Sequence, residues 1–159
     1  MQPDMPTGPA EAATSLILEV FRLNGQLLAA DDRLVSPLDL TSVRWQVLGA
    51  IAESDREKPV SWLARDLGMH RKGVQRITND LLRIGFVELV PNPHHRRARL
   101  VVMTPCGRQA FEAALGVYNP WVESLATGFS VEDLETAKRV AAALRESLQA
   151  LSNEGGAPA

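Results

Sequence analysis

Residues 63–85 read LARDLGMHRKGVQRITNDLLRIG, and this stretch decides the fold. Its first part has leucine at positions 63 and 67 and then Gly68, which is typical of a short helix that ends in a tight turn. Its second part ends at Gly85 and has apolar residues at the spacing of one helix face, at Val74, Ile77, Leu81 and Ile84. Two helices joined by a short turn, the second with a polar and cationic outward side, predict a helix–turn–helix.

The pattern then changes to that of strands. Residues 86–90 and 98–103 are β-branched and apolar, and both can pair across the basic, proline-containing turn 91–97 (PNPHHRR). Thr104 and Pro105 follow, a capping hydroxyl and a proline that suits the first helical position. A β-hairpin directly after a helix–turn–helix predicts a winged helix–turn–helix.

Amphipathic helices are predicted on both sides of this unit. They are expected over residues 10–37, 41–52, 104–126 and from 131 onward. A polar loop is expected over 53–59, and a kink is expected at Pro120. The helices from both chain ends are too apolar along one face to remain in water. The predicted fold class is therefore mainly α with a small β-hairpin.

The net charge of −2 hides an uneven distribution. Residues 58–108 carry ten cations and three acids, a net of +7, whereas the rest of the chain has a net of −9. A basic middle between acidic ends is typical of a polyanion-binding element on a scaffold that does not bind. The alternative is that these cations only coat solvated helix faces.

A helix can enter the major groove of DNA when its outward face is polar and its inward face packs on a core. Arg76 is the preferred reader of guanine, and Gln75 can pair with adenine. The basic hairpin tip suits a minor groove, with Arg97 as the inserting residue. The full predicted set of DNA contacts is Arg71, Lys72, Gln75, Arg76, Asn79, His94, Arg96 and Arg97. The alternatives are solubilising surface residues and a hairpin edge charged against strand pairing.

Other classes of function find little support. The chain has no phosphate-cradling glycine loop and no cysteine–histidine cluster at metal spacing, so we expect no enzyme, no metal site and no cofactor. The N-terminus lacks the pattern of a secretory leader, and no apolar run is long enough to span a membrane. Cys106 is the one cysteine, which fits a reducing, cytoplasmic location. We expect Cys106 to fill a small apolar space, with a thiol redox switch as the alternative.

The chain resembles the MarR family of bacterial transcriptional regulators. The resemblance rests on Leu63-Ala64…Leu67-Gly68, Leu82-Arg83-Ile84-Gly85-Phe86-Val87, Pro93…Arg96-Arg97-Ala98 and Met103-Thr104-Pro105-Cys106-Gly107. It implies a homodimer whose terminal helices interlock and whose winged parts read a pseudo-palindromic operator. It also implies an anionic, often aromatic effector that binds between the two parts. Wings of the family usually carry Asp-x-Arg, whereas this chain has His95 and Arg97.

The resemblance divides the chain into segments. Residues 11–152 are expected to form a single domain, with the winged helix–turn–helix at about 41–103 and dimerisation helices at about 11–36 and 104–151. Residues 1–10 are expected to be disordered, and residues 153–159 to form a flexible tail.

Four residues are candidates for binding the effector. Trp45 and Tyr118 can line an aromatic pocket, and Arg44 can hold a carboxylate. His70 lies at the expected junction of the two parts and is titratable. The overall expectation is a ligand-responsive repressor that binds double-stranded DNA as a homodimer. The alternatives are a winged-helix module that binds proteins instead of DNA, and a redox sensor that uses Cys106.

Overall fold

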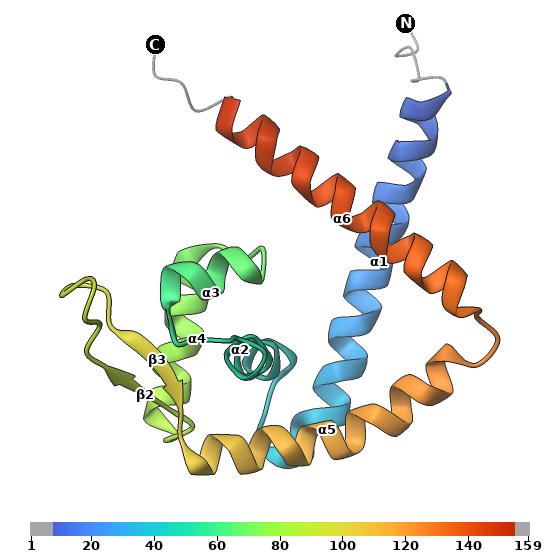
Figure 1. Cartoon of the computed structure of the whole chain (residues 1–159). Helices are drawn as coiled ribbons and strands as arrows, with labels where there is room; N and C mark the ends of the chain where they lie inside the picture. Colours follow the sequence, from blue (N-terminus) through green and yellow to red (C-terminus); the bar gives the residue numbers. More distant parts are fainter. Residues whose placement is uncertain (1–7, 155–159) are drawn as a thin grey trace, which may run out of the picture. The chain divides into compact units, whose positions relative to one another are not determined.

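The computed structural model describes residues 8–154 and is mainly helical, as predicted (Figure 1). Its helices are α1 (Pro9–Val35), the 3-10 turn η1 (Ser36–Leu38), α2 (Ser42–Ala52), α3 (Val60–Asp66), α4 (Arg71–Arg83), α5 (Pro105–Ala126) and α6 (Val131–Glu154). Its strands are β1 (Lys58–Pro59), β2 (Val87–Val90) and β3 (Leu100–Met103). The predicted disordered start and flexible tail fall mainly on residues 1–7 and 155–159, which lie outside the described part of the chain.

The three strands form one antiparallel sheet in the order β1-β3-β2. Val87 lies opposite Met103 and Val90 opposite Leu100, so β2 and β3 form the predicted hairpin. The expectation of a loop over 53–59 is confirmed for residues 53–57 and is wrong for the last two, because Lys58 pairs with Val101 and adds β1 to the free edge of β3. Both hairpin strands also begin later than predicted, at residues 87 and 100.

A single cluster of buried side chains joins α2, α3, α4 and the sheet. Its most buried members include Val47, Leu48, Leu63, Val74, Leu81 and Val101. Thr78 is also fully buried, and its hydroxyl donates to the Val74 carbonyl at 2.8 Å, which satisfies the polar group inside the core. Ile84, which the helical spacing placed on the same inward stripe, lies beyond the last residue of α4 and is 38% exposed.

The hairpin and α4 are tied to the start of α5 by one short segment. The Thr104 backbone N–H donates to the Phe86 carbonyl at 3.0 Å, and the Thr104 hydroxyl donates to the Gly85 carbonyl at 2.6 Å. The Gly107 N–H in turn donates to the Thr104 hydroxyl at 3.0 Å, which caps α5. The Thr-x-x-Gly motif therefore joins the end of β3, the start of β2 and the start of α5 at one point.

The chain divides into two compact units, residues 1–119 and 120–159, and the boundary falls inside α5 at Pro120. The second unit holds the end of α5 and all of α6. Apolar side chains of α6 remain exposed, with Leu148 and Leu151 both at 64%. No helix in the described residues has the length and apolar character needed to cross a membrane.

Candidate nucleic-acid interface

The turn between α3 and α4 sets the start of the second helix. Gly68 has φ +63°, the left-handed conformation that an L side chain rarely adopts, and it ends α3. His70 has extended backbone angles, and its ring Nδ1 accepts the Lys72 N–H at 3.2 Å. The backbone carbonyl of His70 also accepts the N–H groups of Gly73 and Val74. His70 is thus the N-cap of α4, a place usually taken by serine, threonine or aspartate.

Helix α4 separates its two faces as predicted. Val74, Thr78 and Leu81 are fully buried against the core. The outward face carries Arg71, Lys72, Arg76 and Asn79, all exposed, and Gln75, which is half-buried. The Gln75 and Asn79 side chains are hydrogen-bonded to each other. The arrangement presents three cations and two amides on one helix surface, which is the chemistry that base edges and phosphates require.

The loop of the hairpin is braced by Asn92, a residue to which the sequence analysis gave no role. The Asn92 side chain accepts the His94 N–H at 3.0 Å and donates to the Ala98 carbonyl at 2.9 Å, so it spans the loop. Such bonds from an asparagine side chain to the nearby backbone are a regular turn device, and the Asn-Pro pair was the signal for it. Within the described residues Arg97 forms no ion pair, and the bonds of Asn92 brace the backbone of the loop.

The side chains at the tip of the wing are free to meet a partner. His94, His95, Arg96 and Arg97 are all exposed. The Arg99 guanidinium folds back onto the Leu89 carbonyl across the hairpin. Arg99 therefore stiffens the base of the wing, while Arg96 and Arg97 carry its outward positive charge.

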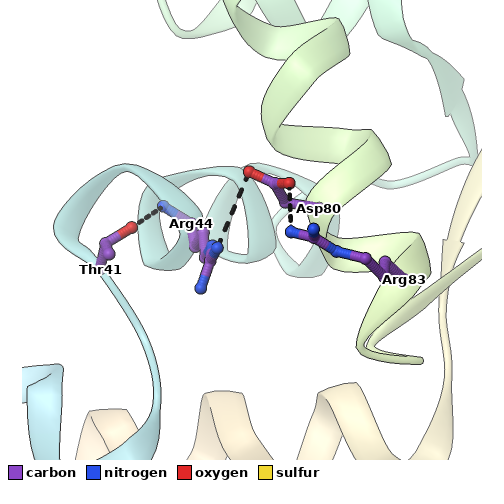
Figure 2. A network of polar contacts seen from close by, with 4 residues as sticks. All are labelled: Thr41, Arg44, Asp80 and Arg83. Atoms are coloured by element: carbon purple, nitrogen blue, oxygen red, sulfur yellow. Dashed lines mark hydrogen bonds and ion pairs between the residues drawn. The ribbon is translucent and has the colours of Figure 1, made fainter.

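Arg44 is paired with an acidic side chain of α4. Figure 2 shows that its guanidinium points from α2 toward Asp80 of α4, with Nη2 3.7 Å from Oδ2. Asp80 also holds Arg83, one turn along α4, at 2.6 Å. Asp80 is the one acidic residue of α4, and it joins cations of two helices. Arg44 thus forms an ion pair between α2 and α4, and it is not among the residues that line the aromatic cavity beside α2.

An aromatic cavity does lie beside α2. The Trp45 ring centroid is 4.7 Å from that of Tyr118 and 5.8 Å from that of Phe111. These three rings line a cavity of about 520 Å³ that also has Lys58 and Asp66 on its wall. Trp45 Nε1 is buried with no hydrogen-bond partner among the described residues. Of the four predicted effector residues, the structure brings Trp45 and Tyr118 together and leaves Arg44 and His70 outside.

Two neighbouring carboxylates of α1 meet the start of α2. Asp32 Oδ1 accepts the Ser42 N–H at 2.6 Å, and Asp31 Oδ2 accepts the Ser42 hydroxyl at 3.4 Å. Burial raises the pKa of Asp31, the Ser42 hydroxyl lowers it, and the charge of Asp32 raises it further, for a net increase. Burial, and then the charge of Asp31, likewise raise the pKa of Tyr118.

We expect Asp31→Asn to stabilise the protein at pH 7. A carboxyl whose pKa is raised on folding contributes stability that is fully present below its unfolded pKa and is lost as the pH rises through the folded pKa. At pH 7 the ionised Asp31 is therefore unfavourable, and its neutral replacement should raise the free energy of unfolding by up to about 1 kcal/mol, with solvent screening keeping the gain small. Urea unfolding at pH 7 and pH 4 measures it, and the gain should shrink at the lower pH.

The matched control is Asp32→Asn, which weakens the short bond to the Ser42 N–H and should lower stability at pH 7. A less stable Asp31→Asn protein at pH 7 would contradict the assignment of Asp31 as the unfavourable charge.

A second and larger hollow, about 890 Å³, lies between the wing and the start of α3. Its wall includes Trp62, Asn92, His94 and His95. The guanidiniums of Arg56 and Arg65 lie 5.0 Å and 5.7 Å from the Trp62 ring centroid, within cation–π range. The pairing of the wing with the 55–62 segment depends on β1, which the sequence analysis missed.

Cys106 is exposed in the first turn of α5, so the expected role as a filler of apolar space is wrong. The thiol alternative stays a prediction. Among residues 8–154, no group of three or more histidine, cysteine, aspartate or glutamate side chains is placed to hold a metal ion.

Comparison with known proteins agrees with this geometry. A model of the MarR family matches residues 38–98, from the end of η1 into the wing. The uncharacterised protein Rv2011c of Mycobacterium tuberculosis is 41% identical over 98 residues, which cover 62% of this chain and 67% of that protein.

Solved structures share the fold. The M. tuberculosis transcriptional regulator MOSR, in complex with DNA, matches with a TM-score of 0.73 and 25% identity over 85% of this chain and 96% of that one. CouR from Rhodococcus jostii RHA1, bound to p-coumaroyl-CoA, matches with a TM-score of 0.74 and 18% identity over 82% of this chain and 91% of that one.

The fold and the basic surface of α4 and the wing define a winged helix–turn–helix protein. The chain belongs to the MarR family of transcriptional regulators. The resemblance seen in the sequence is thereby confirmed, while the dimer, the effector and the named DNA contacts remain predictions.

Proposed function

We propose that the protein is a homodimeric repressor that binds a pseudo-palindromic DNA operator. A small effector releases the protein from the operator. The observation that carries the proposal is the outward face of α4, where Arg71, Lys72 and Arg76 stand exposed on a helix whose other face is buried. The exposed arginines of the wing lie on the same unit, and MOSR, which shares this fold, is solved with DNA. In this proposal the protein works in the cytoplasm, without a cofactor and without catalysis.

The direct test is a gel-shift titration with the DNA upstream of the protein's own gene. We expect a complex whose affinity falls steeply with salt, because bound phosphates release counterions. Absence of a complex at low salt, with folded dimer present, would refute the proposal. A partner affinity that barely responds to salt would instead favour the protein-binding module, and loss of DNA binding on oxidation that Cys106→Ser abolishes would favour the redox sensor.

We propose that residues 41–103 bind DNA and that the helices at about 11–36 and 104–151 form the dimer. In the single chain, helices α1 and α6 both have exposed apolar side chains. On α1 these are Leu16, Ile17, Leu18, Val20, Phe21 and Leu23, and on α6 they include Leu134, Val140, Leu148 and Leu151. Exposed apolar surface on this scale is typical of an interface between subunits.

Phe21→Asp is expected to convert the dimer into a monomer. Phe21 is 69% exposed in the single chain, so the substitution removes little packing within it but places a charge in the proposed interface. Sedimentation velocity at micromolar concentration measures the change. Ser61→Asp adds the same charge at an exposed polar position of α3, outside the helices proposed for dimerisation, and serves as the control. An unchanged dimer in Phe21→Asp would contradict the use of this face.

The proposed effector site is the aromatic cavity of Trp45, Phe111 and Tyr118. Its apolar rings suit a planar aromatic molecule, and the one lysine on its wall, Lys58, is paired with Asp66 at 2.7 Å. CouR, of the same fold, is solved with p-coumaroyl-CoA. Titration of the protein–DNA complex with aromatic carboxylates, beginning with 4-hydroxycinnamate, tests this. Release that is lost in Trp45→Leu supports the site, and release that persists there refutes it.

A further inference from the structure

The outward face of α4 holds two amide side chains one turn apart that are bonded to each other. Gln75 Nε2 donates to Asn79 Oδ1 at 3.0 Å. The pair lies among the cations of this face, with Asn79 exposed and Gln75 half-buried. Residues four positions apart on a helix are neighbours, so the bond forms without any distortion of α4.

The bond determines which groups of Gln75 remain for a ligand. A glutamine amide has one carbonyl oxygen and two N–H donors, and the bond to Asn79 uses one donor. The Oε1 acceptor and the second Nε2–H are left. An adenine in the major groove offers the matching pair, an N6 amino donor and an N7 acceptor.

The bond also couples the orientations of the two amides. Turning the Gln75 amide alone by half a turn would bring its Oε1 against Asn79 Oδ1, and two acceptors cannot bond, so the Gln75 amide can turn only together with that of Asn79. Guanine has O6 where adenine has its amino group, so a Gln75 oxygen held in the observed orientation would face another acceptor. The orientation therefore favours adenine and disfavours guanine at the same position.

We propose that Asn79 is a positioning residue that fixes the Gln75 amide for recognition of adenine at one position of each half-site. The inference rests on the proposed DNA-binding function and adds to it the identity of one base and the residue that enforces it. Asn79 acts through Gln75, so its effect should vanish when Gln75 is absent.

The test first selects bound sequences from a random DNA pool with the full-length protein, which gives the half-site and the position where adenine is enriched. Affinity is then measured for operators that carry each of the four bases at that position. Gln75→Ala should reduce the adenine-to-guanine affinity ratio to near one. Asn79→Ala should reduce the same ratio by about fivefold or more. Adding Asn79→Ala to Gln75→Ala should change that ratio no further.

Asn79→Asp is the conservative variant. It keeps an oxygen that accepts the Gln75 N–H but adds a charge that repels phosphate, so it should retain the adenine preference while binding all sequences more weakly. A structural defect alone would lower affinity in Asn79→Ala without changing the ratio, and circular dichroism checks that each variant is folded.

The outcomes separate two failures. Sequence-specific binding with an unaltered ratio in Asn79→Ala, or an altered preference at a different base pair, would overturn this inference and leave the proposed function standing. A wild-type protein that enriches no sequence would overturn the proposed function, and the inference with it.

Discussion

Gly107→Ala is expected to lower the free energy of unfolding by about 3 kcal/mol, because it forces side-chain volume into backbone. A Cβ at position 107 would lie 1.9 Å from the Phe86 carbonyl oxygen and 2.8 Å from its carbon. No rotamer can relieve a contact between a Cβ and a backbone group. The same carbonyl accepts the Thr104 N–H, so moving it away breaks the joint between the hairpin and α5. Thermal and urea unfolding measure the loss.

Gly116→Ala is the matched control for this change. Gly116 lies in the same helix, and a Cβ built there meets nothing within 4 Å. Because alanine is a better helix former than glycine, this variant should be as stable as the wild type or more stable by about 0.5–1 kcal/mol. Equal unfolding midpoints for the two variants would contradict this prediction, because they would show that the Phe86 backbone moves away from the added Cβ with no loss of stability.

The second large effect concerns DNA. Arg76→Lys keeps the charge but loses the planar fork that can bond both O6 and N7 of guanine. We expect it to relax base preference at one position of the half-site by about 1–3 kcal/mol. Lys72→Ala should instead weaken binding to all sequences alike and reduce the slope of log affinity against log salt by about 1. Fluorescence anisotropy with a set of single-base operator variants measures both.

Arg83→Ala is the control on the same helix. Arg83 is held by Asp80 near the end of α4 and lies outside the predicted contact set, so its removal should leave base preference unchanged. An Arg76→Lys protein with the wild-type preference at every position would refute the assignment of Arg76 as a base reader.

Much of the fold could be predicted because its signals are local. The glycine at 68, the helical spacing of Val74, Ile77 and Leu81, and the capping hydroxyl at 104 each act within one or two turns of chain. The strand β1 could not be predicted in this way. It has two residues, one of them a proline, and it exists because β3, some forty residues later, offers a free edge.

At the candidate site, too, features set by local sequence could be predicted and contacts between distant segments could not. The exposure of Arg71, Lys72 and Arg76 follows from periodicity on one helix. The partner of Arg44 does not, because the contact with Asp80 depends on how α2 packs against α4. Thr78 was missed as a core residue because its hydroxyl marks it as polar in a pattern, although a bond to the preceding turn makes it acceptable inside.

The cap at the start of α4 has a consequence for the chemistry of His70. Only a neutral imidazole has a ring nitrogen that can accept a hydrogen bond, and here that nitrogen is Nδ1. In a neutral ring that makes this bond the proton lies on Nε2, so the cap favours one tautomer. The exposed imidazole then offers its Nε2–H as a donor near the backbone N–H groups of the first turn. A serine or aspartate cap has no second ring nitrogen and offers no such donor.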